Sequence, residues 1–201
     1  MKITVIGATG MIGSRIVAEA ASRGHEVTAV SRSGAAAEGA SKTAAMELSD
    51  TPAVRAAIEA SDATVIAVAP DRSGGSHEPT IQAHRDLIAA QPHARFLVVG
   101  GAGSLEIDGV RLKDTPGFPP AYYNEAATLS TVLDLYRASK NLNWTILSPA
   151  PAIAPGKRTG AYRVGSNSPV GDAISAEDFA VAVVDEIEKP AHTGTRFTVA
   201  N

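Results

Sequence analysis

The sequence contains no cysteine, and this absence removes several kinds of chemistry at once. Disulfide bonds, zinc sites built on thiolates and a cysteine nucleophile are all excluded. The chain also lacks a long hydrophobic run, since no apolar stretch reaches the roughly 18 residues of a membrane-spanning helix. Positive charge is not in excess either, because 18 Lys and Arg stand against 21 Asp and Glu, with a formal net charge of −3. Binding to nucleic acid or to an anionic membrane is therefore not expected.

The N-terminus carries only a short apolar segment. Residues 3–6 pass directly into glycine, without the longer apolar stretch of a secretory signal peptide. We therefore expect a cytoplasmic protein. A length of 201 residues suits one hydrophobic core, so residues 1–201 are expected to form a single domain.

Apolar segments of strand length alternate along the chain with longer segments of helical period. Strands are predicted at 2–6, 26–31, 43–48, 63–68, 95–99, 143–147 and 196–199. Helices are predicted at 11–23, from 52 on, at 78–90, at 121–140 and from 176 on. This order predicts an α/β protein of Rossmann type, with a doubly wound, mainly parallel sheet.

Two segments interrupt this alternation. Residues 104–112 alternate around Asp108-Gly109, which predicts a small inserted β-hairpin with a type I′ turn. Residues 149–171 are rich in Pro and Gly and lack helical period. They are predicted to form a C-terminal loop region on the substrate side of the sheet.

A glycine-rich turn joins the first strand to the first helix. Gly7 allows a tight turn, Gly10 leaves room for a pyrophosphate, and Gly13 lets the helix pack close to the sheet. The start of the helix adds free N–H groups and a partial positive charge. The turn therefore predicts a dinucleotide-binding site. Further backbone contacts are expected from Thr9, Met11 and Ile12.

The end of the second strand indicates which dinucleotide is bound. NAD-binding proteins usually carry Asp or Glu there, to hold the ribose 2′-hydroxyl. Here the strand ends in Ser31-Arg32-Ser33, where Arg32 suits a 2′-phosphate and the two serines add hydroxyl donors. We therefore expect NADP(H) to be preferred over NAD(H). Other expected cofactor neighbours are Glu47 and Leu48 near the adenine, and Ala67, Ala69 and Pro70 along the groove.

Several motifs together resemble the short-chain dehydrogenase/reductase superfamily in its extended and atypical branches. They are Gly-x-x-Gly-x-x-Gly at 7–13, the segments 98–105 and 114–119, and Leu147-Ser148-Pro149-Ala150. The sequence is similar to the bacterial NADH-flavin reductase family, related to biliverdin-IXβ/flavin reductases, and more distantly to NmrA-like proteins. The resemblance covers essentially the whole chain and implies a doubly wound sheet, bound NADP(H) and hydride transfer. The cofactor site is expected to be completed by Gly100, Gly101, Ala102, Ser148 and Pro149.

The acid–base pair of that superfamily is not found at its usual place. One Tyr-x-x-x-Lys exists, at Tyr136 and Lys140, but it comes at the end of the long helix, too late to reach the cofactor. Tyr122 and Tyr123 stand at the start of this helix and are the catalytic candidates, although no lysine follows four residues later. An equally weighted alternative is that both tyrosines pack under the proline-rich loop 115–120.

Alcohol oxidation needs a positioned base, and no lysine is placed to lower the pKa of either tyrosine. Reduction of an electrophilic acceptor is less demanding. We therefore expect an NADPH-dependent reductase whose small-molecule acceptor is a flavin, a quinone or a similar conjugated compound. Residues 100–103 and 149–165 would form an acceptor shelf together with Tyr122 and Tyr123. In this shelf Lys157 and Arg158 are candidate contacts for an acidic group such as a flavin phosphate, although two adjacent basic residues in a loop are more often simply solvated.

The alternative is a non-catalytic regulator of the NmrA type that senses NADP(H). No metal site is expected, because no acid or cysteine completes one around His77 and His84. The protein is expected to act as a monomer or a homodimer.

Overall fold

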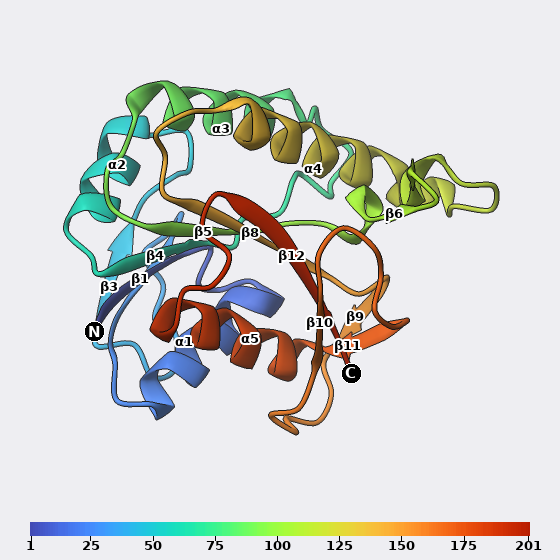
Figure 1. Cartoon of the computed structure of the whole chain (residues 1–201). Helices are drawn as coiled ribbons and strands as arrows, with labels where there is room; N and C mark the ends of the chain where they lie inside the picture. The colour runs from blue at the N-terminus through green and yellow to red at the C-terminus, as the bar shows by residue number, and fades with distance from the viewer.

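An eight-stranded sheet forms the centre of the fold (Figure 1). The computed structural model describes residues 1–201. Its strands are β1 (Lys2–Ile6), β2 (Glu26–Ser31), β3 (Lys42–Ala45), β4 (Ala63–Ile66), β5 (Phe96–Val99), β8 (Trp144–Pro149), β10 (Arg163–Gly165) and β12 (Thr195–Ala200). They are ordered β10-β12-β8-β5-β4-β1-β2-β3 across the sheet. Every neighbouring pair is parallel except β10 with β12.

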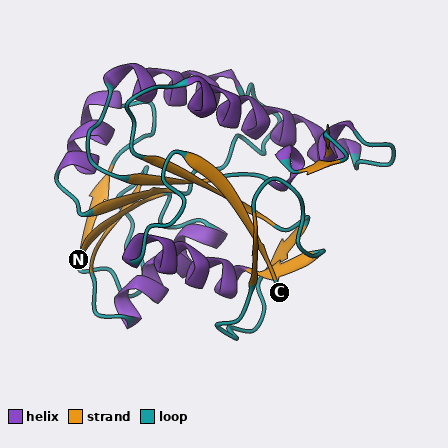
Figure 2. Ribbon diagram, viewed as in Figure 1, coloured by secondary structure: helices purple, strands orange, loops and turns teal.

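Five α-helices cover the two faces of this sheet (Figure 2). On one face α1 (Met11–Ser22) and α5 (Ala176–Glu188) lie side by side, and on the other lie α2 (Thr51–Glu59), α3 (Glu78–Ala90) and α4 (Pro120–Ala138). The seven parallel strands all end at the same edge of the sheet. The predicted doubly wound Rossmann-type fold is therefore confirmed.

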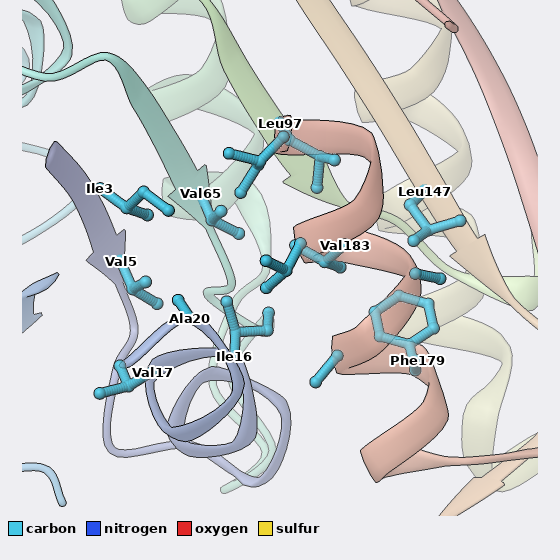
Figure 3. Close-up of a cluster of buried hydrophobic side chains, with 14 of the residues drawn as sticks. Ile3, Val5, Ile16, Val17, Ala20, Val65, Leu97, Leu147, Phe179 and Val183 are labelled. Carbon is cyan, nitrogen blue, oxygen red and sulfur yellow. The ribbon is translucent and has the colours of Figure 1, made fainter. Parts of the chain in front are cut away.

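The face under α1 and α5 holds the larger core. Figure 3 shows Ile16 and Ala20 of α1 beside Val5 of β1, and Phe179 of α5 beside Leu147 of β8. These side chains are almost completely inaccessible to solvent. The apolar positions of α1 recur at three- and four-residue spacing, so one stripe of the helix is buried while the rest faces solvent.

The opposite face is closed by an aromatic group between α4 and the central strands. The Tyr136 ring lies 5.8 Å from Phe96 and 5.6 Å from Trp144, measured between ring centroids. All three side chains are buried. This group anchors the C-terminal end of α4 over the amino ends of β5 and β8.

The inserted hairpin is present as predicted. β6 (Glu106–Ile107) and β7 (Val110–Arg111) pair antiparallel, and Asp108 and Gly109 have φ values of 51° and 79°. Positive φ at both central residues is the requirement of a type I′ turn. Two short 3-10 helices, η1 (Ala102–Ser104) and η2 (Leu112–Asp114), flank the hairpin.

Two strands are shorter than predicted, because each loses its partner. β3 ends at Ala45, since Met46 donates its N–H to Ser31 at the end of β2 and no backbone remains to pair. β4 ends at Ile66, because its neighbour β1 turns away at Gly7. Their predicted ends at residues 48 and 68 were wrong.

The segment 149–171 is not the single irregular loop that its composition predicts. β9 (Ala152–Ala154) pairs with β11 (Ala173–Ser175), and β10 extends the main sheet beside β12. Strands of three residues are too short to show a period in the sequence. Their pairing partners lie further along the chain, so nothing local reveals them.

Candidate functional site

The turn after β1 is shaped by two close backbone contacts. Gly7 has a φ of 90°, and a Cβ atom there would overlap the carbonyl oxygen of Ala67 after β4. A Cβ atom on Gly13 would overlap the carbonyl oxygen of Gly7 itself. Both positions need glycine for the turn to close and for α1 to approach the sheet.

The amino end of α1 is open to a ligand. The N–H groups of Met11, Ile12 and Gly13 donate to no protein atom, and no side chain caps the helix. Gly10 has φ −75° and ψ 166°, and a Cβ atom there would stay 3.4 Å from its nearest protein neighbour. The protein thus leaves free N–H donors and open space together, which suits a diphosphate.

The end of β2 lies next to this turn. Both Gly7 and Ala8 donate their N–H groups to the Val30 carbonyl, at 2.9 and 3.0 Å. Two residues later the Arg32 side chain is exposed and has no ion-pair partner in the chain. Ser31 is buried and its hydroxyl accepts the Ala35 N–H at 3.0 Å. Arg32 is therefore the free cation of this corner.

The other predicted groove residues differ in their accessibility. Glu47 is exposed, whereas Leu48 is packed in the core under α2 and has little surface for an adenine. Ala67 donates its N–H to Ile6 at 2.8 Å, which ties the end of β4 to β1. Ala69 is exposed and Pro70 is buried. A short path of small residues thus continues from the glycine turn toward β5.

The glycines after β5 have a structural reason of their own. A Cβ atom on Gly100 would lie 2.8 Å from Ile146, and one on Gly101 would lie 2.8 Å from Leu129 of α4. Ser148 stands beside Gly100 on β8, fully buried, and its hydroxyl has no protein partner. These contacts bring the first turns of α4 against the end of β5. The sequence did not reveal them, because the partners are distant in the chain.

Tyr136 is placed where it cannot act on a ligand. It is fully buried, its hydroxyl lies 3.0 Å from Nδ1 of His84, and burial raises the pKa of its phenol. Lys140 comes after the last residue of α4, so it does not share a helix face with Tyr136. The tyrosine of this Tyr-x-x-x-Lys motif is therefore part of the core between α3 and α4.

Tyr122 and Tyr123 lie in the first turn of α4 and keep 65% and 43% of their surface exposed. That exposure does not fit the alternative in which both pack under the proline-rich loop. The Tyr123 ring meets Phe118 edge-on, with 6.5 Å between centroids, and Lys113 Nζ lies 5.6 Å from its centre. Neither phenol hydroxyl makes a hydrogen bond in the structure. They form a surface rather than a proton relay.

The loop after β4 makes contacts with α4 that the sequence does not reveal. We call residues 71–77 the β4 flap. Its Arg72 donates two hydrogen bonds to the Glu125 carboxylate, at 2.9 and 2.7 Å. Its His77 lies 2.8 Å from the Thr128 hydroxyl and donates Nε2–H to the Asp71 carbonyl at 2.7 Å. No sequence motif marks these contacts, which hold the flap beside Tyr122.

The candidate contacts for an acidic group are not available as expected. Arg158 donates to both oxygens of Glu19 on α1, at 2.7 and 2.8 Å. This hydrogen bonding holds the pKa of Glu19 below its ordinary value. Arg158 thus pins the segment after β9 to α1 and already has a carboxylate partner there, so it is not a free cation for a substrate phosphate. Lys157 remains exposed on the same segment.

Comparison with known proteins identifies the family of the chain. Residues 7–190 match the family described as "NAD(P)H-binding". The chain belongs to this NAD(P)H-binding family. Its match covers the glycine turn, the β4 flap and α4 together. The predicted resemblance is confirmed, and the family match supports a nicotinamide cofactor.

Three relatives of this NAD(P)H-binding protein span its full length. The uncharacterised protein YwnB from Bacillus subtilis is 39% identical and covers 100% of the chain and 99% of YwnB. A "putative exported protein" from Burkholderia pseudomallei is 39% identical, with a TM-score of 0.88 and full coverage of both chains. A "putative NADH-flavin reductase" from Streptococcus pneumoniae is 36% identical, with a TM-score of 0.86 and coverage of 100% and 99%.

Two further properties of the structure bear on the site. None of its helices has the length and apolar character required to cross a membrane. No three His, Cys, Asp or Glu side chains gather closely enough to hold a metal ion.

Proposed function

We propose that this protein is an NADPH-dependent reductase that passes hydride to a flavin, a quinone or a similar conjugated acceptor. The observation that carries the proposal is that the free N–H groups of α1 and the Arg32 guanidinium, which has no ion-pair partner, lie at the same corner of the sheet. The helix end suits the diphosphate that all nicotinamide dinucleotides share. The guanidinium suits the 2′-phosphate that only the phosphorylated form carries.

The acceptor class is argued from the acid–base groups that the chain offers. Alcohol oxidation needs a base held at the hydroxyl, and the tyrosine of the Tyr-x-x-x-Lys spacing is buried against His84. A bound nicotinamide would supply the hydride, a conjugated acceptor is electrophilic enough to accept it, and solvent can then supply the proton. The protein then has to hold the two rings in contact and exclude competing reactions. Tyr122 and Tyr123 support such a role, because they are exposed at the start of α4, which packs through Ala126 on Gly103 after β5.

The test is the oxidation of NADPH by the purified protein with a panel of FMN, FAD, riboflavin, quinones and biliverdin. We expect acceptor-dependent loss of NADPH absorbance with at least one member. Tyr136→Phe is the control, and its turnover should stay within about twofold of wild type, because a buried phenol does not exchange protons with substrate.

Two results would contradict the proposal. Saturable NADPH binding without oxidation by any acceptor would favour the NmrA-type sensor instead. A loss of about a hundredfold in Tyr136→Phe, with the fold intact, would place the acid–base chemistry on the tyrosine assigned to the core.

A further inference from the structure

The aromatic residues of this chain are unevenly distributed. There are nine of them, four Tyr, four Phe and one Trp. Five are buried, and Tyr162 is tied to Asp185 through its hydroxyl. The remaining three, Phe118, Tyr122 and Tyr123, stand together within six residues and include the two most exposed rings of the chain. We call these three residues the aromatic shelf.

The aromatic shelf is joined to the carboxyl edge of the sheet from two sides. Gly103 after β5 packs so closely on Ala126 of α4 that a Cβ atom there would overlap it. The β4 flap reaches the same helix through Arg72 and Glu125. Strands β4 and β5 are neighbours in the sheet, so the shelf stands at the ends of its central strands.

Every cation around the shelf carries its own carboxylate. Arg72 is bound by Glu125, and Lys113 Nζ donates to both oxygens of Asp114 at 2.6 and 2.8 Å. On the adjoining hairpin, Arg111 donates to Asp134. The hydrogen bonds that Arg72 donates to Glu125 raise the pKa of Arg72, as expected for a cation held by its own counter-ion. The surroundings of the shelf therefore offer no free cation.

We propose that the aromatic shelf binds an uncharged planar conjugated ring, so that riboflavin or a neutral quinone is favoured over a phosphorylated flavin. This inference rests on the proposed reductase function, because it names the acceptor of that reaction. Exposed tyrosines supply flat apolar area with little conformational entropy to lose. A phosphate arriving here would find the cations already bound and the carboxylates repulsive.

The test measures flavin binding directly, without turnover. Riboflavin and FMN are titrated into the NADP⁺-saturated protein, and their fluorescence is followed. We expect riboflavin to bind about tenfold more tightly than FMN, which is the size of effect that one unfavourable charge contact gives. Tyr122→Ala should weaken both flavins to a similar extent, because it removes stacking area common to both.

A charge variant isolates the electrostatic part. Glu125→Gln releases the Arg72 cation, and FMN binding should tighten about fivefold or more while riboflavin binding stays the same. Glu26→Gln is the matched control, since it releases Lys42 at the opposite edge of the sheet and should change neither flavin.

The outcomes separate this inference from the function on which it rests. FMN binding as tightly as riboflavin, or neither flavin binding, overturns the inference even if another acceptor oxidises NADPH. An unchanged FMN to riboflavin ratio in Glu125→Gln also overturns it. Riboflavin binding with the expected preference but no NADPH oxidation supports the shelf and removes the reductase function.

Discussion

At the scale of single residues, four glycines of the candidate site are required by close contacts with backbone or side-chain atoms. Gly7 and Gly13 have local reasons to be glycine, and the structure shows both as backbone contacts within the turn and its neighbouring strand. Gly100 and Gly101 were assigned to the site for their position alone. Their steric partners, Ile146 and Leu129, come from other elements, so the sequence alone does not show why glycine is required there.

Gly10 and Gly13 make a matched pair for testing the turn. Gly10→Ala should leave stability within about 1 kcal/mol of wild type, because the backbone is extended and the space is open. It should weaken NADPH binding about tenfold or more, since the methyl group enters the space proposed for the diphosphate. Gly13→Ala should instead cost about 3 kcal/mol or prevent folding. Denaturant unfolding and calorimetry measure the two effects, and unaltered NADPH affinity in Gly10→Ala would contradict the assignment.

His84 is expected to make stability depend on pH. It is fully buried, and burial lowers its pKa to about 4, whereas the unfolded chain titrates near 6.5. Between these values the unfolded state binds more protons, so stability falls as pH drops through this window, by roughly 2 to 3 kcal/mol. Unfolding free energy measured from pH 7 to pH 4.5 should show this slope.

The control for this prediction is a second histidine. His84→Gln should flatten the slope, whereas His93→Gln, at an exposed position, should keep it. The paired carboxylates, such as Glu19, lose their contribution only at lower pH, because their pKa values are depressed. An equal slope in His84→Gln and wild type would contradict the account.

At the scale of elements, the start of α5 shows what could and could not be predicted. The Ser175 hydroxyl accepts the Asp178 N–H at 3.0 Å, which is the usual capping bond of a serine before a helix. The Asp178 carboxylate does not return to Ser175. It accepts the N–H groups of Thr159 and Gly160, both at 2.8 Å, and Asn201 caps the Ser175 N–H instead. These partners are 18 residues or more away, so local sequence reasoning could not find them.

Asp178 is therefore expected to hold the segment between β9 and β10. Burial alone would raise its pKa, but hydrogen bonds from Thr159, Gly160 and Asn201 outweigh this and lower it. Asp178→Ala should cost about 2 to 4 kcal/mol, because several donors lose a charged acceptor. Its partner position Ser175→Ala should cost only about 1 kcal/mol, as a lost cap. Chemical denaturation compares the two, and equal small losses would show that this segment is held by other contacts.

At the scale of the whole molecule, the alternating pattern was sufficient for the architecture. Continuous apolar strands such as β4 and β5 are covered on both faces, as a doubly wound sheet requires. The same reasoning placed both ends of the nucleotide site at one edge, because parallel strands end together. The alternating pattern could not predict that the β4 flap contacts α4 or that Arg158 binds α1. Both contacts are ion pairs between distant segments of the chain.

The central claim is that one corner of this edge binds the diphosphate through α1 and selects the 2′-phosphate through Arg32. Isothermal titration calorimetry of wild type and Arg32→Ala with NADPH and NADH tests it most directly. We predict that wild type prefers NADPH, and that Arg32→Ala weakens NADPH binding by about ten- to a hundredfold while NADH changes less than about threefold. Equal losses for both dinucleotides, or no saturable heat with either one, would contradict the account.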